Sequence, residues 1–412
     1  MVPKRFVHGA AARARFGSSI DRLETLLRVG DPLADDAVIA LSRMPRQAAV
    51  SLVDTAIARG IDKADGAPTE LRALFAELEH VPAWVDQEAI RRGGELLFRV
   101  GFFGGLALAT SLLYGYASPA GNKPLVFSGR LMEQAPRRLV ETSRFVEQTC
   151  LPRGLARFGE GFAITAKVRV MHAYIRKMMK DSPAWREDEW GLPANQHDMG
   201  ATALLFSVVV IDTLRSFGFD FDAEEVHLFM QLWRYSGYLM GVSPEVLPTS
   251  EFDAKRLAEM IAATEEGPDD DSRGLSRALF ATGDEPPRAT EAERERARKM
   301  VRLGQGLIRG TLGEELADLL DVPKHDYRYA FQPVRALVGT IERAARFGGG
   351  AIWNRYRSGG IARGHAYWKS IVNTPGAPLT FGPPDALLGK VVRVADDVTR
   401  TRATLRNVAR PR

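Results

Sequence analysis

Nineteen consecutive residues of this chain, Val100 to Ser118, carry no charged side chain (VGFFGGLALATSLLYGYAS). An apolar run of this length must avoid water, either by crossing a membrane or by packing inside the protein. The run contains several glycines, Arg99 precedes it directly, and no second spanning segment accompanies it. We therefore expect a helix that is buried on all sides, and no stable membrane insertion.

The remainder of the chain also has the pattern of helices. Apolar residues recur with helical period, and alternating strand patterns are hard to find. Proline and N-capping residues mark several helix starts, as at Asp31-Pro32 and Pro136. The predicted fold is all-α, with one large helical domain over residues 31–345. Helices are expected over 32–41, 45–58, 67–78, 87–101, 136–150, 161–180, 197–217, 223–240, 290–309 and 312–320.

Three segments differ from this pattern in composition. Residues 1–30 begin with a basic stretch and are expected to form an N-terminal arm on the surface. Residues 266–290 are acidic and contain prolines near both ends, which favours a solvated loop. Residues 346–412 are basic and are interrupted by Pro375, Pro378, Pro383 and Pro384, which indicates a peripheral C-terminal extension.

Charge and composition exclude several classes of site. The net charge of +5 on 56 basic and 51 acidic residues gives no support for nucleic-acid binding. Cys150 is the only cysteine, so neither an internal disulfide nor a multi-cysteine zinc site is possible. None of the seven histidines lies four residues from another. A two-histidine metal site on one helix is therefore excluded, whereas a single axial histidine to a haem iron remains possible.

The predicted helix over 161–180 is the first candidate for chemistry. Thr165, Arg169, His172 and Arg176 recur on one narrow stripe, beside an apolar face that includes Met171. A histidine flanked by arginines at the edge of a buried face could bind an anionic cofactor or a metal. The alternative is an amphipathic helix whose polar edge includes one histidine.

The preceding helix offers a second set of polar residues. Arg138 and Thr142 lie one turn apart, and a guanidinium is well suited to carboxylates. Arg138 could instead form a surface ion pair with Glu141. Thr142 could bond a ligand or its own helix backbone.

Five short motifs occur in a fixed order along the chain, and together they resemble the latex clearing protein family, within the wider MpaB and rubber-oxygenase group. The resemblance spans roughly residues 30–345, with thirty residues between Thr142 and His172. The motifs are Pro82-Ala83-Trp84-Val85-Asp86, Arg137-Arg138-x-x-x-Thr142, Val168-Arg169-x-x-His172-Ala173-x-x-Arg176, the loop Leu192 to Met199 (LPANQHDM), and Trp233 to Val242 (WRYSGYLMGV).

The resemblance implies an all-α fold that encloses one haem b in a pocket, with helices packed in a globin-like way, in an oxidoreductase that uses dioxygen to cleave carbon–carbon double bonds. It implies that His172 is the proximal iron ligand and that Arg138 and Thr142 lie in the haem pocket. The predicted cofactor-binding residues are therefore His172, Arg138 and the flanking Arg169, and the predicted catalytic residues are Arg138, Glu141 and Thr142. Val100 to Ser118 could line the substrate channel, although core packing alone would also explain it.

Two positions depart from the rubber-cleaving members of that family. Those members carry a lysine directly before the motif threonine, where this chain has Glu141. They carry a glutamate sixteen positions before the motif arginine, where this chain has Asn122. Glu141 could be a substitute base, a distal group or a solvent-facing side chain.

Because of these departures, we do not expect rubber cleavage by the same mechanism. The N-terminus lacks the apolar run of a secretory signal, which predicts a cytoplasmic enzyme acting on a smaller isoprenoid or lipid-like substrate. The alternatives are a haem protein with a peroxidase-like or sensing role and a haem-free helical protein that binds apolar ligands.

Overall fold

The computed structural model describes residues 2–127, 131–281 and 290–372, and of residues 131–138 it describes the backbone alone. Within these ranges every regular element is a helix and no strand occurs. The all-α prediction is confirmed.

The helices follow the predicted periodicity closely over most of the chain. The N-terminal half contains α1 Gly9–Phe16, α2 Ser19–Leu26, α3 Pro32–Leu41, α4 Arg46–Arg59, η1 Ile61–Lys63, α5 Thr69–Glu79, α6 Gln87–Val100, α7 Phe102–Tyr116, α8 Pro119–Phe127, α9 Leu131–Cys150 and α10 Glu160–Lys180. The second half contains α11 Glu187–Trp190, α12 Gln196–Phe206, α13 Val208–Ser216, α14 Ala223–Leu239, η2 Pro244–Val246, α15 Glu251–Ala262, α16 Asp270–Ala281, α17 Glu291–Leu312, α18 Glu314–Leu319, η3 Asp326–Ala330, α19 Phe331–Phe347 and α20 Gly350–Val372.

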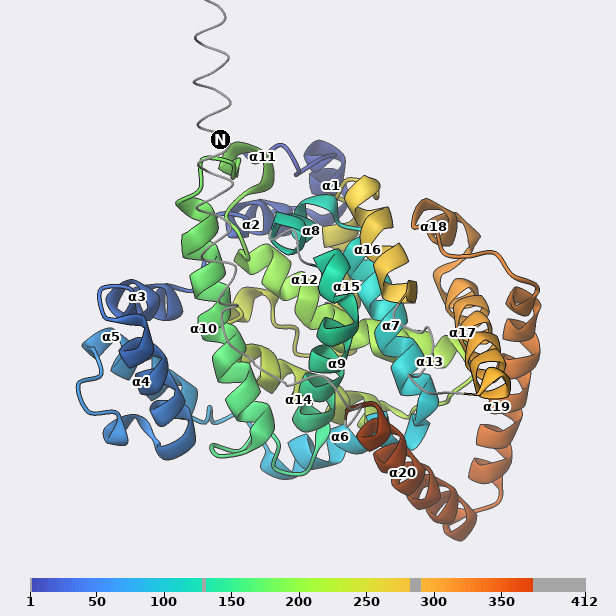
Figure 1. Ribbon diagram of the computed structural model, residues 1–412. Helices are drawn as coiled ribbons and strands as arrows, with labels where there is room; N and C mark the ends of the chain where they lie inside the picture. Colours follow the sequence, from blue (N-terminus) through green and yellow to red (C-terminus); the bar gives the residue numbers. More distant parts are fainter. Residues whose placement is uncertain (1, 128–130, 282–289, 373–412) are drawn as a thin grey trace, which may run out of the picture.

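The long helix α10 separates two parts of the molecule. Helices α3, α4 and α5 lie on one side of it, and α9, α12 and α14 lie on the other (Figure 1). Helix α6 runs underneath and packs against both α14 and α20. Gly93 permits the close contact with α14, because a β-carbon there would lie 2.3 Å from the Leu228 carbonyl oxygen.

The uncharged run over 100–118 forms helix α7, which is buried along much of its length as predicted. Gly101 adopts a positive φ of 53°, and the chain bends by 99° between α6 and α7. The bend lies at the start of the uncharged run, so α7 points in a different direction from α6.

One stretch of the described residues, Gln196–Ser216, is long and apolar enough to cross a membrane, and the bent α6–α7 pair would be a second if it formed one span. Half of the apolar window of Gln196–Ser216 is buried inside the protein, as in a core helix. The stretch is also interrupted at Ser207, where the backbone leaves helical geometry. The single helix predicted over 197–217 is therefore two helices, α12 and α13.

The N-terminal residues are part of the packed structure and do not form a surface arm. Helix α2 buries Ile20 and Leu23 in the core, and the Arg5 side chain is 3% exposed. The prediction for residues 1–30 is wrong, because α2 repeats apolar residues every three to four positions and this face packs inward.

The predicted acidic loop over 266–290 is also partly wrong. Residues 270–281 form helix α16, which buries Leu275 and Leu279, and its aspartates occupy the first turn, where the helix dipole favours negative charge. Residues 282–289 lie outside the described part of the chain.

The first part of the predicted C-terminal extension is helix α20, which packs tightly against α6. Trp368 is fully buried, and the His365 ring stacks on Phe98 with a centroid distance of 3.8 Å. Residues 350–372 thus belong to the folded body, and the prediction of a peripheral segment is wrong for them. Residues 373–412 lie outside the described residues.

Candidate functional site

A large cavity of about 1720 Å³ lies beside α10, which contributes residues between Val168 and Met179 to its wall. Its wall is mostly apolar and comes from helices that are far apart in the sequence, chiefly α7, α9, α10, α12, α15 and α16. Small-molecule sites usually occupy about 300–1,000 Å³, so the cavity can hold more than one small ligand at once.

His172 on α10 lies in the wall of this cavity. Around it the same helix contributes Val168, Met171 and Ile175, so the imidazole is set in an apolar surface. A neutral imidazole is a common ligand of iron and other transition metals. Among the described residues, Arg46 on α4 is the one lysine or arginine in the wall, and its guanidinium could pair with a carboxylate of a bound group.

The other residues of the polar stripe of α10 form hydrogen bonds and ion pairs within the protein. The Arg169 guanidinium binds Asp31 (Nε to Oδ2, 2.7 Å) and Glu77 (2.7 Å), and it is 2% exposed. Arg176 binds Asp35 in the same way (2.7 Å), and Thr165 donates to the Gly161 carbonyl oxygen (2.7 Å).

The predicted cofactor-binding role of Arg169 is therefore corrected, since its guanidinium joins α10 to α3 and α5 and is absent from the cavity wall. His172 faces the cavity because it lies at the edge of the stripe nearest to the apolar face, whereas the long arginine side chains extend toward the N-terminal helices.

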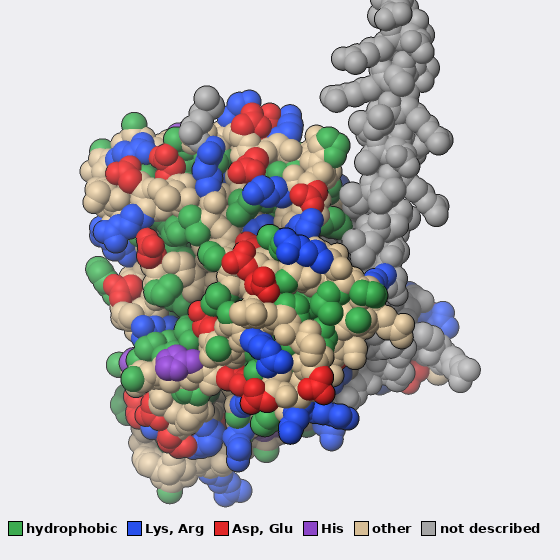
Figure 2. All heavy atoms as spheres, turned by 90° about the vertical axis from the view of Figure 1, so that its left-hand side faces the viewer, with side chains coloured by type: hydrophobic (Ala, Val, Ile, Leu, Met, Phe, Trp, Pro, Cys, Tyr) green, Lys and Arg blue, Asp and Glu red, His purple; other side chains and the backbone are tan. Residues whose placement is uncertain are grey.

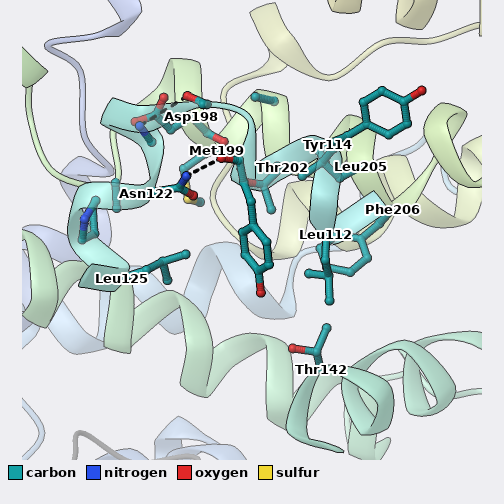
Figure 3. A pocket seen from close by; sticks show the side chains of 18 of the residues that line it. Leu112, Tyr114, Asn122, Leu125, Thr142, Asp198, Met199, Thr202, Leu205 and Phe206 are labelled. Atoms are coloured by element: carbon teal, nitrogen blue, oxygen red, sulfur yellow. Dashed lines mark hydrogen bonds between the residues drawn. The ribbon is translucent and has the colours of Figure 1, made fainter. Parts of the chain in front are cut away.

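Helix α9 brings two further predicted residues to the cavity. Thr142 faces the side chains of Leu112 and Phe206 from the opposite helices (Figure 3). Glu141 is half-buried in the same wall. The Arg138 side chain lies outside the described residues.

Asn122 on α8 also lines the cavity. It is 2% exposed, and its Nδ2 donates to the Tyr116 carbonyl oxygen at 2.7 Å (Figure 3). An amide held in this way can orient a ligand by its oxygen, but it cannot take up a proton near neutral pH.

A cluster of charges closes the cavity near Asn122. The Arg5 guanidinium donates to Asp198 (2.9 Å) and Glu265 (2.7 Å), and Ser118 donates to the second oxygen of Glu265 (2.7 Å). Burial works against the charged form of Asp198, but Arg5 and the hydrogen bond with His197 hold the pKa of its carboxyl well below its usual range. Asp198 and Glu265 are both paired with the Arg5 guanidinium, so these residues form an internal ion-pair cluster.

The first turn of α12, which carries His197 and Asp198, and the loop before it fix this end of the cavity. Asn195 caps α12 through the Asp198 amide (2.9 Å), and the Gln196 side chain donates to the carbonyl oxygens of Gly30 and Gly241 (2.9 Å each). The family-like motif over 192–199 therefore organises the wall through backbone contacts.

Aromatic rings form another part of the wall that the sequence did not reveal. Phe206 stacks on Trp233 (centroids 5.1 Å apart), and Phe145 meets both rings edge-on. These residues come from α9, α12 and α14, so no local pattern links them. Only the motif that begins at Trp233 pointed to one of them.

Comparison with known proteins places this cavity in context. Residues 92–343, more than half of the chain, match the family described as ER-bound oxygenase mpaB/B'/Rubber oxygenase, catalytic domain. The chain belongs to this family. The resemblance stated from the motifs is confirmed, and every predicted site residue lies within the matched range.

Two relatives illustrate the similarity. The rubber oxygenase of Streptomyces sp. (strain K30) is 24% identical over 270 residues, which are 63% of this chain and 62% of that protein. The match thus spans less than two thirds of the relative. The fold is similar to that of a latex clearing protein in the closed state, with a TM-score of 0.61 at 18% identity, over 87% of this chain and 95% of that chain.

Proposed function

We propose that this protein is a haem b-dependent oxygenase that uses dioxygen on an unsaturated apolar substrate of isoprenoid or lipid-like character. The observation that carries the proposal is the position of His172, in the apolar wall of a cavity large enough for a macrocycle and a substrate, in a member of an oxygenase family.

The residues of the cavity suit a haem in three respects. His172 offers one imidazole, which is sufficient because a haem can be held by one protein ligand. Val168, Met171 and Ile175 offer an apolar surface for the macrocycle. Arg46 offers a cation for the propionates, and Arg138 remains a predicted second one.

A bound haem would supply the oxygen chemistry, while the protein orients the substrate and excludes water. In this proposal Thr142 positions dioxygen or the reacting double bond by its hydroxyl, from the wall opposite Leu112. Glu141 is the carboxylate of α9 in the wall, and it would hold or accept a proton there. Asn122 orients the substrate through its amide and takes no proton, so the reaction differs from a rubber cleavage that depends on a glutamate at that place.

The test is the visible spectrum of the protein expressed with ample iron and a haem precursor. We expect a Soret band that His172→Ala shifts or abolishes, together with a loss of bound haem measured chemically. His227→Ala is the matched control, since His227 is exposed on α14 and lies outside the cavity wall. A Soret band that His172→Ala leaves unchanged would reject the ligand assignment.

Two further readouts separate the alternatives. Oxygen uptake with a neutral unsaturated isoprenoid should fall at least about tenfold in Glu141→Gln, which keeps the shape and removes the proton-accepting group, while the spectrum stays the same. A stable haem spectrum with no oxygen uptake would favour a peroxidase-like or sensing role. A folded protein without a Soret band that still binds apolar probes would favour a haem-free ligand carrier.

A further inference from the structure

The corner between α19 and α20 exposes large apolar side chains to solvent. Phe347, at the end of α19, is 88% exposed, and Ile352, in the first turn of α20, is 54% exposed. Ile341 on α19 is also exposed. The two helices meet at the lower right of the molecule, where their junction protrudes from the body (Figure 1). Side chains of this size are seldom left in water in such a group without an interaction to serve.

The charged side chains of these two helices are almost all basic, although Arg346 pairs with Asp220, Asp222 and Glu225, and Arg357 pairs with Glu95. Residues 331–372 contain six arginines and one lysine, whereas the single acidic residue, Glu342, is fully buried and paired with Arg99 (2.9 Å). Arg343 and Arg355 flank the corner, are exposed, and have no ion pair with any residue that the structure describes. On the side of the molecule shown in Figure 2, by contrast, acidic and basic side chains are intermixed.

We propose that the α19–α20 corner, defined by Ile341, Phe347, Ile352, Arg343 and Arg355, is a docking surface for membranes that contain anionic lipids. Apolar side chains at a protruding tip can enter the interface between headgroups and acyl chains. Flanking arginines are attracted to the negative surface of such a membrane. A second copy of the chain is a poorer partner, because two corners of the same positive charge repel each other. The inference is independent of the proposed catalytic function.

The test is co-sedimentation of the full-length protein with vesicles of phosphatidylcholine alone or with added phosphatidylserine. We expect binding to the anionic vesicles that weakens as salt is raised. Replacing both Phe347 and Ile352 by serine, or Arg343 and Arg355 by glutamate, should lower the bound fraction at least about fivefold.

The matched controls are Phe252→Ser, at a phenylalanine of α15 that is 73% exposed, and Arg22→Glu, at an exposed arginine of α2. Both should bind vesicles as the unchanged protein does, and thermal unfolding checks that all variants fold. Absence of vesicle binding, equal losses in corner and control variants, or corner variants that retain full binding would each overturn the proposal. A concentration-dependent dimer abolished by the corner variants, without vesicle binding, would assign the surface to a second copy.

Discussion

Arg169 shows how a single buried charge can join three helices. Its side chain does not line the cavity. Instead, its guanidinium binds the carboxylates of Asp31, the N-cap of α3, and of Glu77 on α5. Desolvation works against the charged guanidinium, but Asp31 and Glu77 outweigh it and raise the pKa of Arg169. Arg169 is therefore charged inside the core, and removal of one partner leaves a buried charge without compensation.

Arg169→Met is expected to lower the free energy of unfolding by about 3–5 kcal/mol, because Asp31 is then buried without its cation. Urea unfolding measures this. Arg15→Met is the control, since the pair of Arg15 with Glu259 is exposed and should cost less than about 1 kcal/mol. If the folded Arg169→Met variant also changed the Soret band, the assignment of this arginine to a structural role would fail.

The lowered pKa of Asp198 predicts how the stability of the fold depends on pH. Its folded pKa lies below the unfolded value of 3.8, so the carboxylate stabilises the fold at pH above that value, and the stabilisation is lost as pH falls below about 4. Asp198→Asn should reduce stability at pH 7 by roughly 1–3 kcal/mol, because Arg5 loses a partner.

The same variant should also lose less stability than the unchanged protein between pH 5 and about pH 3, in denaturant melts at each pH. An identical pH dependence of the two proteins would contradict the assignment of this carboxylate.

At the scale of elements, the period of apolar residues predicted most helices, including α7, α10 and α14. It did not predict which helices pair. Arg169 and His172 lie on one stripe in sequence, but the guanidinium binds the carboxylates of Asp31 and Glu77, whereas the imidazole lines a cavity built by helices that are distant in sequence. Composition misled at residues 270–281, because acidic residues that suggested a loop are favourable in the first turn of a helix.

Helix α20 provides a test of a helix pairing that composition did not reveal. A β-carbon on Gly364 would lie 1.8 Å from the Phe98 carbonyl oxygen of α6, whereas one on Gly350 of the same helix would meet no atom within 4 Å. Gly364→Ala should therefore lower the thermal midpoint by several degrees, since a backbone must move. Gly350→Ala should be neutral or slightly stabilising. Equal effects of the two substitutions would show that α20 does not pack on α6 as described.

For the whole molecule, the size of the cavity is the property that bears most on substrate choice. It reaches from His172 on α10 to the ends of α15 and α16, where Leu275 and Leu279 line it. A haem near His172 would leave this far part for an extended apolar chain. We expect such a chain to pass Leu112 of α7, which lines the cavity and faces Thr142 (Figure 3).

Leu112→Trp should therefore weaken the binding of long ligands more than that of short ones. We expect a long isoprenoid alcohol, geranylgeraniol, to lose about tenfold in affinity, since overlap with an apolar wall costs about 1–3 kcal/mol, while the short geraniol loses much less. Displacement of Nile red measures both affinities without requiring turnover. Leu319→Trp, at an exposed leucine of α18, should leave both unchanged. Equal losses for the two alcohols would mean that the chain does not pass Leu112, and the proposed division of the cavity would be wrong.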